Sequence, residues 1–406
     1  MGYTKRELIK AGLSAGIAVA GDSLLGSALV AASRSDRRKF TPGVPWLDAA
    51  GKPIQAHGAS ILRVGDTFYW YGENKEFTTG KTDIWTWGVR CYASQDLYNW
   101  TDLGLIIQPT PSDPQSPLNP SKAKLDRPHI LFNPRTNKFI CWMKIMENDG
   151  RQTRTVMSAD KITGPYSIVS AGVMPLGMNG GDFDLVASAA DGKTYQYFER
   201  VHSEMICADL TEDYTALTGY YSTHFPTHAT GLVREGPAYF SRGGKHYLIT
   251  SGTTGYHPNP SEVAMADTFH GPWTVLGDLH ASDRSRTSFN SQVSSVFKHP
   301  AKKDLYIALA DRWNVDLPKI AGSSFPSGAA YRRIIEAMQK IERGGPVRSA
   351  ADAESRLTPD EAAYLRATFL TGVDTSRATY VWLPIRFDGE RPYVDWRSEW
   401  SLDEFE

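Results

Sequence analysis

The most informative segment of the sequence is Val64-Gly65-Asp66-Thr67-Phe68-Tyr69-Trp70-Tyr71, in which a Gly-Asp turn leads into a run of aromatic residues. Gly and Asp are typical of tight turns, and aromatic residues are enriched in β-strands. The same order of turn and strand returns four more times, at Thr136–Trp142, Asp191–Tyr195, Gly243–Leu248 and Lys303–Ile307. A recurring pattern of this kind indicates a repeat architecture.

Each segment belongs to a longer unit, which opens with a polar-centred strand and closes near a Trp or Tyr, as at Tyr98-Asn99-Trp100 and Gly271-Pro272-Trp273. Short aromatic and β-branched runs bounded by Gly, Asn and Asp predominate, and helical periodicity is nearly absent. The sequence therefore predicts an all-β fold, a five-bladed β-propeller in which the first strand of each blade lines the central channel. A β-sandwich is the alternative, but it would not explain five similar units.

The exception is a stretch of about 314–376, where the sequence becomes helical. Ala329–Arg343 places Ile334 and Met338 on one face, and Thr358-Pro359-Asp360-Glu361 is a helix start because Thr caps and Pro opens the first turn. This pattern predicts a helical insertion in the fifth blade. The insertion either rims the site or braces the outside, and its apolar face favours bracing because that face needs a docking surface.

Composition excludes several classes of protein. The 406 residues carry 44 Lys plus Arg against 45 Asp plus Glu, a formal net charge of −1, so no nucleic-acid partner is expected. The cysteines Cys91, Cys141 and Cys207 form no CxxC pair, which argues against a structural zinc site and a disulfide scaffold. The 11 Trp, 19 Tyr and 16 Phe suit a many-stranded protein that binds sugars by ring stacking.

Residues 1–39 have the character of an export signal and linker, which precede the propeller domain at 40–406. Lys5-Arg6 and Lys10 come before an apolar stretch from Ala11 to Val30 that ends in small residues. The start resembles a twin-arginine signal with one arginine replaced by lysine. Polar residues interrupt the stretch, so no stable membrane span is expected. This predicts a periplasmic or secreted protein; an ordinary N-terminal helix is the alternative.

Five polar positions fall at equivalent places in the first strands of the blades: Gln55 or His57, Asp126, Asp182, Glu235 and Gln292. If these strands line the channel, the side chains converge, and like charge and burial spread the pKa values of the carboxylates. Glycosidic bond cleavage requires one acid that keeps its proton and a second group that attacks or activates water. The sequence therefore predicts a carboxylate site on the propeller axis, with an oligo- or polysaccharide as partner.

Plainer interpretations stay open for each position. Asp126 beside Arg127 is typical of a structural ion pair, and Asp182 beside Gly180-Gly181 is typical of a turn. His57 fits a packed channel residue better than a metal ligand, because no second His lies at ligand spacing. No metal or cofactor is predicted, although the sequence leaves open whether a divalent ion occupies the channel.

At these residues the chain resembles glycoside hydrolase family 43, and within it the branch of exo-β-1,3-galactanases. The matching motifs extend from about Trp46 to Phe405 and exclude the helical insertion. They are Ile54-Gln55-Ala56-His57-Gly58-Ala59, Tyr69-Trp70-Tyr71-Gly72-Glu73-Asn74-Lys75, Asp126-Arg127-Pro128, Arg234-Glu235-Gly236-Pro237-Ala238, Ser251-Gly252-Thr253-Thr254-Gly255-Tyr256-His257-Pro258-Asn259, Phe289-Asn290-Ser291-Gln292, Asp311-Arg312-Trp313 and Tyr380-Val381-Trp382-Leu383-Pro384.

The resemblance implies a five-bladed propeller that inverts anomeric configuration. Glu235 then resembles the general acid, and Asp182 the carboxylate that orients it and adjusts its pKa. The branch lacks the first-blade Asp base of most of the family, and Asp126 and Gln292 correspond to the groups suspected of handling the water. The residues expected to contact sugar are Glu73, Gln55, His57, Thr253, Tyr256, Arg312 and Trp313.

The chain departs from the branch at four positions. Asp126 is one methylene shorter than the usual Glu, and Gly180-Gly181-Asp182 replaces a Ser-Arg-Asp motif. Tyr256 stands in place of a Trp, and Gly236 in place of an Ala. These changes bear on which sugar is bound and on whether the site turns over.

The function predicted from the sequence is an exported, inverting, exo-acting glycosidase that releases galactose from β-1,3-galactan such as the arabinogalactan backbone. A nearer alternative is another family 43 activity: α-L-arabinofuranosidase, β-xylosidase or β-galactofuranosidase. An alternative of a different class is a sugar-binding propeller without turnover, which the altered Ser-Arg-Asp motif and the missing first-blade base favour. The sequence does not indicate the oligomeric state.

Overall fold

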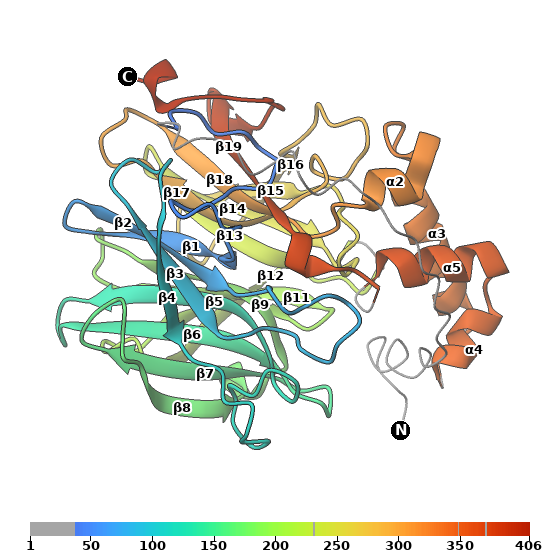
Figure 1. Ribbon diagram of the computed structural model, residues 1–406, viewed down its shortest axis with the longest axis horizontal. Coiled ribbons are helices and arrows are strands. Elements are labelled where there is room, and N and C mark those ends of the chain that lie inside the picture. The colour runs from blue at the N-terminus through green and yellow to red at the C-terminus, as the bar shows by residue number, and fades with distance from the viewer. Residues whose placement is uncertain (1–36, 230–231, 348, 370–371) are drawn as a thin grey trace.

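The computed structural model describes residues 37–229, 232–347, 349–369 and 372–406. The predicted export signal falls on residues 1–36 and so lies outside the described residues. Within the described ranges, no helix is long and apolar enough to cross a membrane. The described chain forms a ring of β-sheets with a group of helices on one side of it (Figure 1).

Five antiparallel four-stranded sheets form the blades, each in simple sequence order. Blade 1 contains β1 (His57–Val64), β2 (Thr67–Glu73), β3 (Val89–Ser94) and β4 (Thr101–Ile107). Blade 2 contains β5 (Lys124–Asn133), β6 (Lys138–Met146), β7 (Gln152–Ala159) and β8 (Ser167–Val173). Blade 3 contains β9 (Gly180–Ala187), β10 (Thr194–Arg200), β11 (Glu204–Leu210) and β12 (Leu217–His224). Blade 4 contains β13 (Arg234–Arg242), β14 (Lys245–Gly252), β15 (Glu262–Ala266) and β16 (Thr274–Asp278). Blade 5 contains β17 (Gln292–Lys298), β18 (Tyr306–Arg312), β19 (Thr379–Asp388) and β20 (Arg391–Tyr393).

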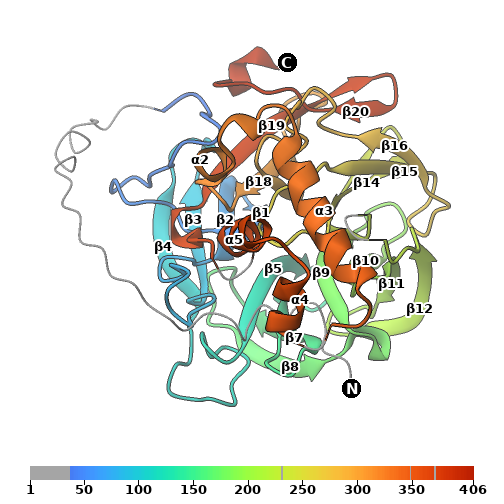
Figure 2. The same cartoon turned by 90° about the vertical axis from the view of Figure 1, so that its right-hand side faces the viewer.

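The first strands of the blades form a closed ring. β1 contacts both β5 and β17, β9 contacts β5 and β13, and β13 contacts β17. Figure 2 looks onto this ring from the side of the helices. The five-bladed β-propeller predicted from the repeats is thereby confirmed.

Every first strand carries one extra residue near its beginning. Three residue steps of β1, from His57 to Ser60, span two steps of β2, and the same excess follows Asp126 in β5 and Glu235 in β13. β9 and β17 carry theirs between 180 and 183 and between 293 and 295. A β-bulge of this kind bends a strand and re-aims its side chains. The predicted site residues therefore lie beside the bulges.

Aromatic side chains fill the space between the blades. The ring of Trp70 on β2 lies 4.5 Å from the rings of Tyr380 and Trp382 on β19, which joins blade 1 to blade 5. Near the chain ends, Phe40 stacks on Trp400 at 4.4 Å, and their backbones form a β-bridge. All three cysteines are buried and free. Packing and backbone hydrogen bonds therefore hold these blades together, and none of the three cysteines takes part in a disulfide.

The helical insertion lies between β18 and β19, inside the fifth blade. Thr358 caps the last helix, because its hydroxyl accepts a hydrogen bond from the Glu361 N–H. Ile334 and Met338 pack against Tyr364, so the apolar faces of the helices are buried within the insertion. The helices are α2 (Leu317–Ala321), α3 (Ala329–Arg343), α4 (Ala350–Ser355) and α5 (Pro359–Thr368). Short 3₁₀ turns lie at Pro175–Gly177, Gly322–Ser324, Thr375–Arg377 and Leu402–Glu404.

The expectation that the insertion braces the outside is wrong. β18 ends and β19 begins on the face where the first strands start, and Figure 2 shows α3 and α5 in front of the ring. Tyr364 of α5 lies 3.4 Å from the ring nitrogen Nε2 of His257, and Gln55 donates a hydrogen bond to the Ser376 carbonyl at 3.1 Å. Because its helices pack on one another, the insertion needs no outer blade face, and it rims the channel.

Candidate active site

The structure brings the predicted carboxylates together at the beginnings of the first strands. Asp126, Asp182 and Glu235 stand on β5, β9 and β13, next to the bulges, and each is at most 9% exposed. In two of these strands the residue after the carboxylate is left-handed: φ is 52° at Arg127 and 58° at Gly236. The bulges thus place the carboxylates of three different blades around one axis.

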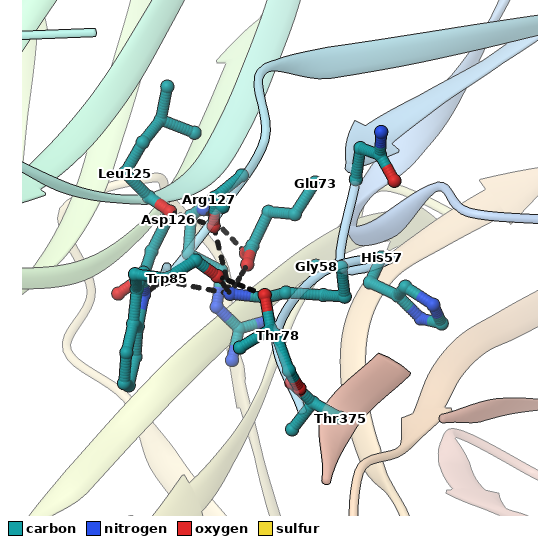
Figure 3. A network of polar contacts seen from close by, with 12 residues as sticks. His57, Gly58, Glu73, Thr78, Trp85, Leu125, Asp126, Arg127 and Thr375 are labelled. Atoms are coloured by element: carbon teal, nitrogen blue, oxygen red, sulfur yellow. Dashed lines mark hydrogen bonds and ion pairs between the residues drawn. The ribbon is translucent and has the colours of Figure 1, made fainter. Parts of the chain in front are cut away.

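Asp126 is held by groups from blades 1 and 2. Its Oδ1 accepts a hydrogen bond from the indole N–H of Trp85 at 2.5 Å and lies 3.8 Å from the ammonium of Lys75, and its Oδ2 lies 3.1 Å from that of Lys144. Figure 3 shows the side chains of Glu73, Trp85 and Asp126 converging. Burial alone would raise the pKa of Asp126, but Lys144, Lys75 and the indole hold it below its usual value. Asp126 is therefore a buried carboxylate that stays ionised.

Asp182 lies between two cations. Its Oδ2 lies 2.9 Å from Nη2 of Arg127, and its Oδ1 pairs with the ammonium of Lys144. Lys144 bridges Asp182 to Asp126 because it contacts both carboxylates. The two aspartates that the sequence placed on the axis are thus joined by one buried lysine.

Arg127 is the hub of the charged cluster. Burial opposes its charge, but Asp182, Glu73, Asp311 and Glu235 together raise its pKa above the usual value for arginine. Its Nη2 also donates a hydrogen bond to Oε1 of Gln292 at 2.6 Å. The guanidinium of Arg127 therefore joins Asp182 of blade 3 to Gln292 of blade 5 across the channel.

Glu73 is another buried acid of the cluster, and its pKa is shifted in the opposite direction to that of Asp126. Its Oε1 accepts a hydrogen bond from the Arg127 N–H at 2.9 Å, and its Oε2 lies 2.7 Å from Lys75. Burial is the main cause that raises the pKa of Glu73 to about 7, with the charge of Asp126 adding to the rise and Lys75 opposing it. Of the two carboxylates that face Lys75, Glu73 therefore holds a proton more readily than Asp126.

A small pocket adjoins the cluster on the side of blades 4 and 5. Gln292 connects the two, because its Oε1 also accepts from the indole N–H of Trp313 at 3.3 Å while its Nε2 donates to Ser251. The ring of Tyr256 lies 5.6 Å from Trp313 and stacks on Trp85 at 5.8 Å. Thr253 follows β14 and is half-buried in the loop that carries Tyr256. The pocket is lined by Ser251, Gly255, Tyr256, His257, Pro258, Asn259, Asn290, Ser291, Gln292, Asp311, Trp313 and Asn314.

His57 and Gln55, expected to contact sugar, are engaged in packing. His57 is fully buried, with Nδ1 3.0 Å from Asp311 and Nε2 3.2 Å from the Tyr380 hydroxyl. Gln55 bonds the Lys75 N–H and the Ser376 carbonyl, which links blade 1 to the end of the insertion. Both residues fasten the ring, and neither presents an unbonded polar atom to the pocket.

Arg312, which the resemblance predicts to contact sugar, does not line the pocket. Successive side chains of a strand point to opposite faces, so Arg312 points away from the pocket that its neighbours Asp311 and Trp313 line. Its guanidinium donates to the carbonyls of Phe289 at 3.0 Å and Asn290 at 3.2 Å. Arg312 therefore supports the turn before β17.

Three cations of the site escaped the reasoning from sequence: Lys75, Lys144 and Arg154. Arg154 is fully buried and donates to the carbonyls of Gly180 and Gly181 at 2.9 and 2.8 Å. Burial lowers its pKa to about 9, although Asp182 opposes the shift. Arg154 thus places a guanidinium beside Gly181, which stands where the Ser-Arg-Asp motif has its arginine. For Lys144 the sequence does contain a signal, a lone Lys inside the otherwise apolar strand Trp142-Met143-Lys144-Ile145-Met146.

Metal ligation has no obvious location in the described part of the chain. No group of three or more His, Cys, Asp and Glu side chains there could hold a metal ion. Within the cluster, Lys75, Lys144 and Arg127 already lie against the carboxylates.

Comparison with known proteins agrees with this architecture. Carboxylates on the axis of a five-bladed propeller, beside an aromatic pocket, are typical of proteins that act on carbohydrates. The chain belongs to the glycosyl hydrolases family 43, whose model matches residues 52–316. No curated protein sequence matches the chain.

Solved structures show the same fold. A family 43 β-1,3-galactosidase, BT0265, is 27% identical over 91% of this chain and 65% of its own, with a TM-score of 0.69. An exo-β-1,3-galactanase from Phanerochaete chrysosporium, in complex with β-1,3-galactotriose, is 23% identical over 90% of this chain and 68% of its own, with a TM-score of 0.66. One from Clostridium thermocellum is 24% identical over 89% of this chain and 66% of its own, with a TM-score of 0.64. The chain thus spans about two thirds of the length of these proteins.

Proposed function

We propose that the protein is an inverting, exo-acting glycoside hydrolase that releases galactose from β-1,3-galactan. One observation carries the proposal: Asp126, Asp182 and Glu235 stand beside the bulges of three first strands that line one channel, next to an aromatic pocket. Membership of family 43 supports the reaction class. The β-1,3-galactosidase and exo-galactanase neighbours support the choice of galactose.

In the proposed reaction, Glu235 donates its proton to the glycosidic oxygen as the bond to the anomeric carbon breaks. A water molecule attacks that carbon from the opposite face and loses a proton to a nearby acceptor, which inverts the configuration. Asp126 is held ionised by Lys75 and Lys144, and the Gln292 amide is held by Arg127 and Trp313. These two groups orient the water, and Asp182 tunes the acid.

The first experiment follows the anomer released from β-1,3-galactobiose by NMR. An inverting enzyme releases α-galactose first, which then mutarotates. Glu235→Gln should lower kcat by about 10²- to 10⁴-fold because the variant cannot donate a proton to the leaving oxygen. Retention of configuration, or no turnover by the wild type, would contradict the proposal. A panel of aryl galactosides, arabinofuranosides, xylosides and galactofuranosides separates the other family 43 activities.

A sugar-binding propeller without turnover is the second candidate. It is favoured by the environment of Asp126, whose two oxygens are both engaged with cations or the Trp85 indole, and by Gly181 in place of an arginine. On this alternative the wild type binds galacto-oligosaccharides, releases no product, and Glu235→Gln leaves the affinity unchanged. Calorimetry beside product analysis decides between the two.

Export to the periplasm or the medium by the segment at 1–39 is part of the same proposal, supported by its basic, apolar and small-residue order. N-terminal sequencing of the mature protein tests it, since a chain that retains residue 1 would contradict cleavage. We further propose that hydrolysis needs no metal, because Lys75, Lys144 and Arg127 supply the positive charge around the carboxylates. Activity should then survive dialysis against EDTA.

A further inference from the structure

Two amide side chains in the pocket each leave one atom without a partner. Oδ1 of Asn290 and Nδ2 of Asn314 are buried and form no hydrogen bond within the described residues. Both residues line the pocket, and each is 3% exposed. Buried polar atoms are nearly always hydrogen-bonded in folded proteins, because leaving one unpaired is costly. A pair of such atoms in one pocket indicates that something else completes them.

The backbone before β17 is strained in a way that serves this position. Ser288, Phe289 and Asn290 are consecutive left-handed residues, with φ of 52°, 59° and 55°. Non-glycine residues adopt this conformation at a cost, and such strain concentrates at functional sites. The carboxylate of Asp283 accepts from the Thr287 and Phe289 N–H groups and so holds the turn from inside.

Arg312 holds the same turn from the other side. It donates to the carbonyls of Phe289 and Asn290, and Nδ2 of Asn290 donates to the Asn314 carbonyl at 3.0 Å. The last bond fixes the orientation of the Asn290 amide and leaves its Oδ1 as the unpaired end. The half-buried Arg312, the buried carboxylate of Asp283 and three strained residues thus hold one amide oxygen in position.

From these observations we propose that Asn290 and Asn314 form a subsite for a single sugar hydroxyl. Oδ1 of Asn290 is an acceptor and Nδ2 of Asn314 is a donor, and a hydroxyl is the neutral group that can donate to the one and accept from the other. Tyr256 and Trp313 line the same pocket and provide ring faces for the sugar. The inference rests on the proposed function and adds the residues that select for one hydroxyl of the terminal galactose.

The test combines substrate and protein changes. Hydrolysis of aryl β-galactoside is compared with that of its monodeoxy analogues, for the wild type and for Asn314→Ala. The wild type should reject one analogue by at least 10²-fold in kcat/KM and up to about 10⁴-fold, because a site built around a hydroxyl is left unpaired without it. Asn314→Ala should lower kcat/KM for the full substrate by about 10- to 100-fold. In Asn314→Ala, the kcat/KM of that one analogue divided by the kcat/KM of the full substrate should rise toward 1. The same ratio for the other analogues should stay at its wild-type value.

Thermal unfolding distinguishes a binding role of Asn314 from a purely structural one. Nδ2 of Asn314 has no hydrogen bond to lose, so Asn314→Ala should lower the melting temperature by no more than the cost of the lost packing. Asn259 is the matched control in the same pocket, because its amide is bonded at both ends, to Gly252 N–H and to the Gly252 carbonyl and Thr254. Asn259→Ala should lower the melting temperature and affect all analogues equally.

A buried water that satisfies both amides is the competing occupant. It predicts that Asn314→Ala weakens all analogues alike and lowers the melting temperature as far as Asn259→Ala does, and this result would overturn the subsite. Calorimetry with galactose and its deoxy analogues repeats the comparison without catalysis. Selective binding without turnover would refute only the proposed hydrolase, whereas turnover without a selective hydroxyl would refute only the subsite.

Discussion

The two sides of the channel differ in charge. The side of blades 1 to 3 carries both signs of charge, on Glu73, Lys75, Asp126, Arg127, Lys144 and Asp182. The side of blades 4 and 5 carries the carboxylates Glu235 and Asp311 and the uncharged Tyr256, Asn290, Gln292, Trp313 and Asn314. Charged groups buried on the first side are engaged in ion pairs. On the second side, two buried amides keep unpaired atoms. The buried lysines that hold the carboxylates thus lie on the side of blades 1 to 3, and the unpaired amides lie on the side of blades 4 and 5, which also carries Glu235.

Physical chemistry explains the difference. A buried charge without a counter-ion is unstable, so a cluster that must keep set protonation states needs its partners built in. An amide can be left partly unsatisfied in the free protein and completed by a ligand, at a smaller penalty. The cluster of ion pairs is therefore rigid before substrate arrives, and the two amides of the pocket have capacity left for the sugar.

The largest effect is expected from Lys144→Met, which breaks the charged side. Lys144 joins Asp126 to Asp182, so its removal leaves two buried carboxylates facing each other with less positive charge. Loss of one partner of a buried pair typically costs about 3–5 kcal/mol. Urea denaturation should show that loss, and glycosidase activity should fall with it.

Lys138→Met on the same strand is the matched control. Lys138 is 43% exposed and pairs with the largely exposed Asp160, so its removal should change stability by at most about 1 kcal/mol. Equal losses in the two variants would mean that Lys144 contributes no more than a surface ion pair, and the contrast between the two sides of the channel would then fail.

The next effect concerns proton linkage at Asp184 and His129, which lie 3.4 Å apart behind the charged side. Burial raises the pKa of Asp184 to about 7, and burial together with Arg127 lowers that of His129 to about 3. Between about pH 4 and 6.5 the folded pair holds one proton on Asp184, and the unfolded chain holds one on His129. The two contributions to the pH dependence of stability therefore cancel in the wild type.

Asp184→Asn should remove this balance. The folded variant then binds no proton at the pair, while the unfolded chain still binds one, so its unfolding free energy rises with pH relative to the wild type. The relative gain should reach about 2–3 kcal/mol between pH 4.5 and 6.5, since one proton corresponds to about 1.4 kcal/mol per pH unit. Urea denaturation at the two pH values measures it. A constant difference between variant and wild type would show that the proton is not shared in this way.

The blades and their carboxylates could be predicted because their signals are local. Turn and aromatic strand recur within a few residues, and Asp126 and Glu235 each begin a short motif that a bulge follows. The partners of these carboxylates could not be predicted in the same way. Lys144 of blade 2 reaches Asp182 of the neighbouring blade 3, and only the packing of one blade on the next brings them together.

The direction of a side chain and the partner of an apolar face are harder to predict from sequence. The resemblance rests on Asp311, Arg312 and Trp313 as one motif, and alternation along the strand sends Arg312 to the face opposite its neighbours. The apolar face of Ala329–Arg343 was identified correctly, but periodicity does not reveal what an apolar face packs against. In the structure that partner is Tyr364 of the insertion itself.

A smaller effect on activity should come from the aromatic pocket of blades 4 and 5. The ring of Tyr256 lies between Trp85 and Trp313, and burial is the main cause that raises its pKa well above 10. Tyr256→Ala should lower kcat/KM for β-1,3-galactobiose by about 10-fold through a higher KM, because a stacking surface is lost. Tyr256→Phe keeps the ring and should stay near the wild type. If the Phe variant falls as far as the Ala variant, the hydroxyl matters and stacking is not the main contribution.

The smallest effect is expected at the boundary between the two sides, where Gly236 has a φ of 58°. A Cβ there would lie 3.1 Å from Nε2 of Gln292 and 3.2 Å from Oγ of Ser251. Gly236→Ala should cost about 1–2 kcal/mol from the left-handed backbone and displace the Gln292 amide. Gly65→Ala separates the two contributions, because Gly65 has the same φ of 58° and nothing within 4 Å of its Cβ position. Equal stability losses with lower activity only in Gly236→Ala would show that the amide of Gln292 must stay in place, whereas equal activity in both variants would assign Gly236 to backbone geometry alone.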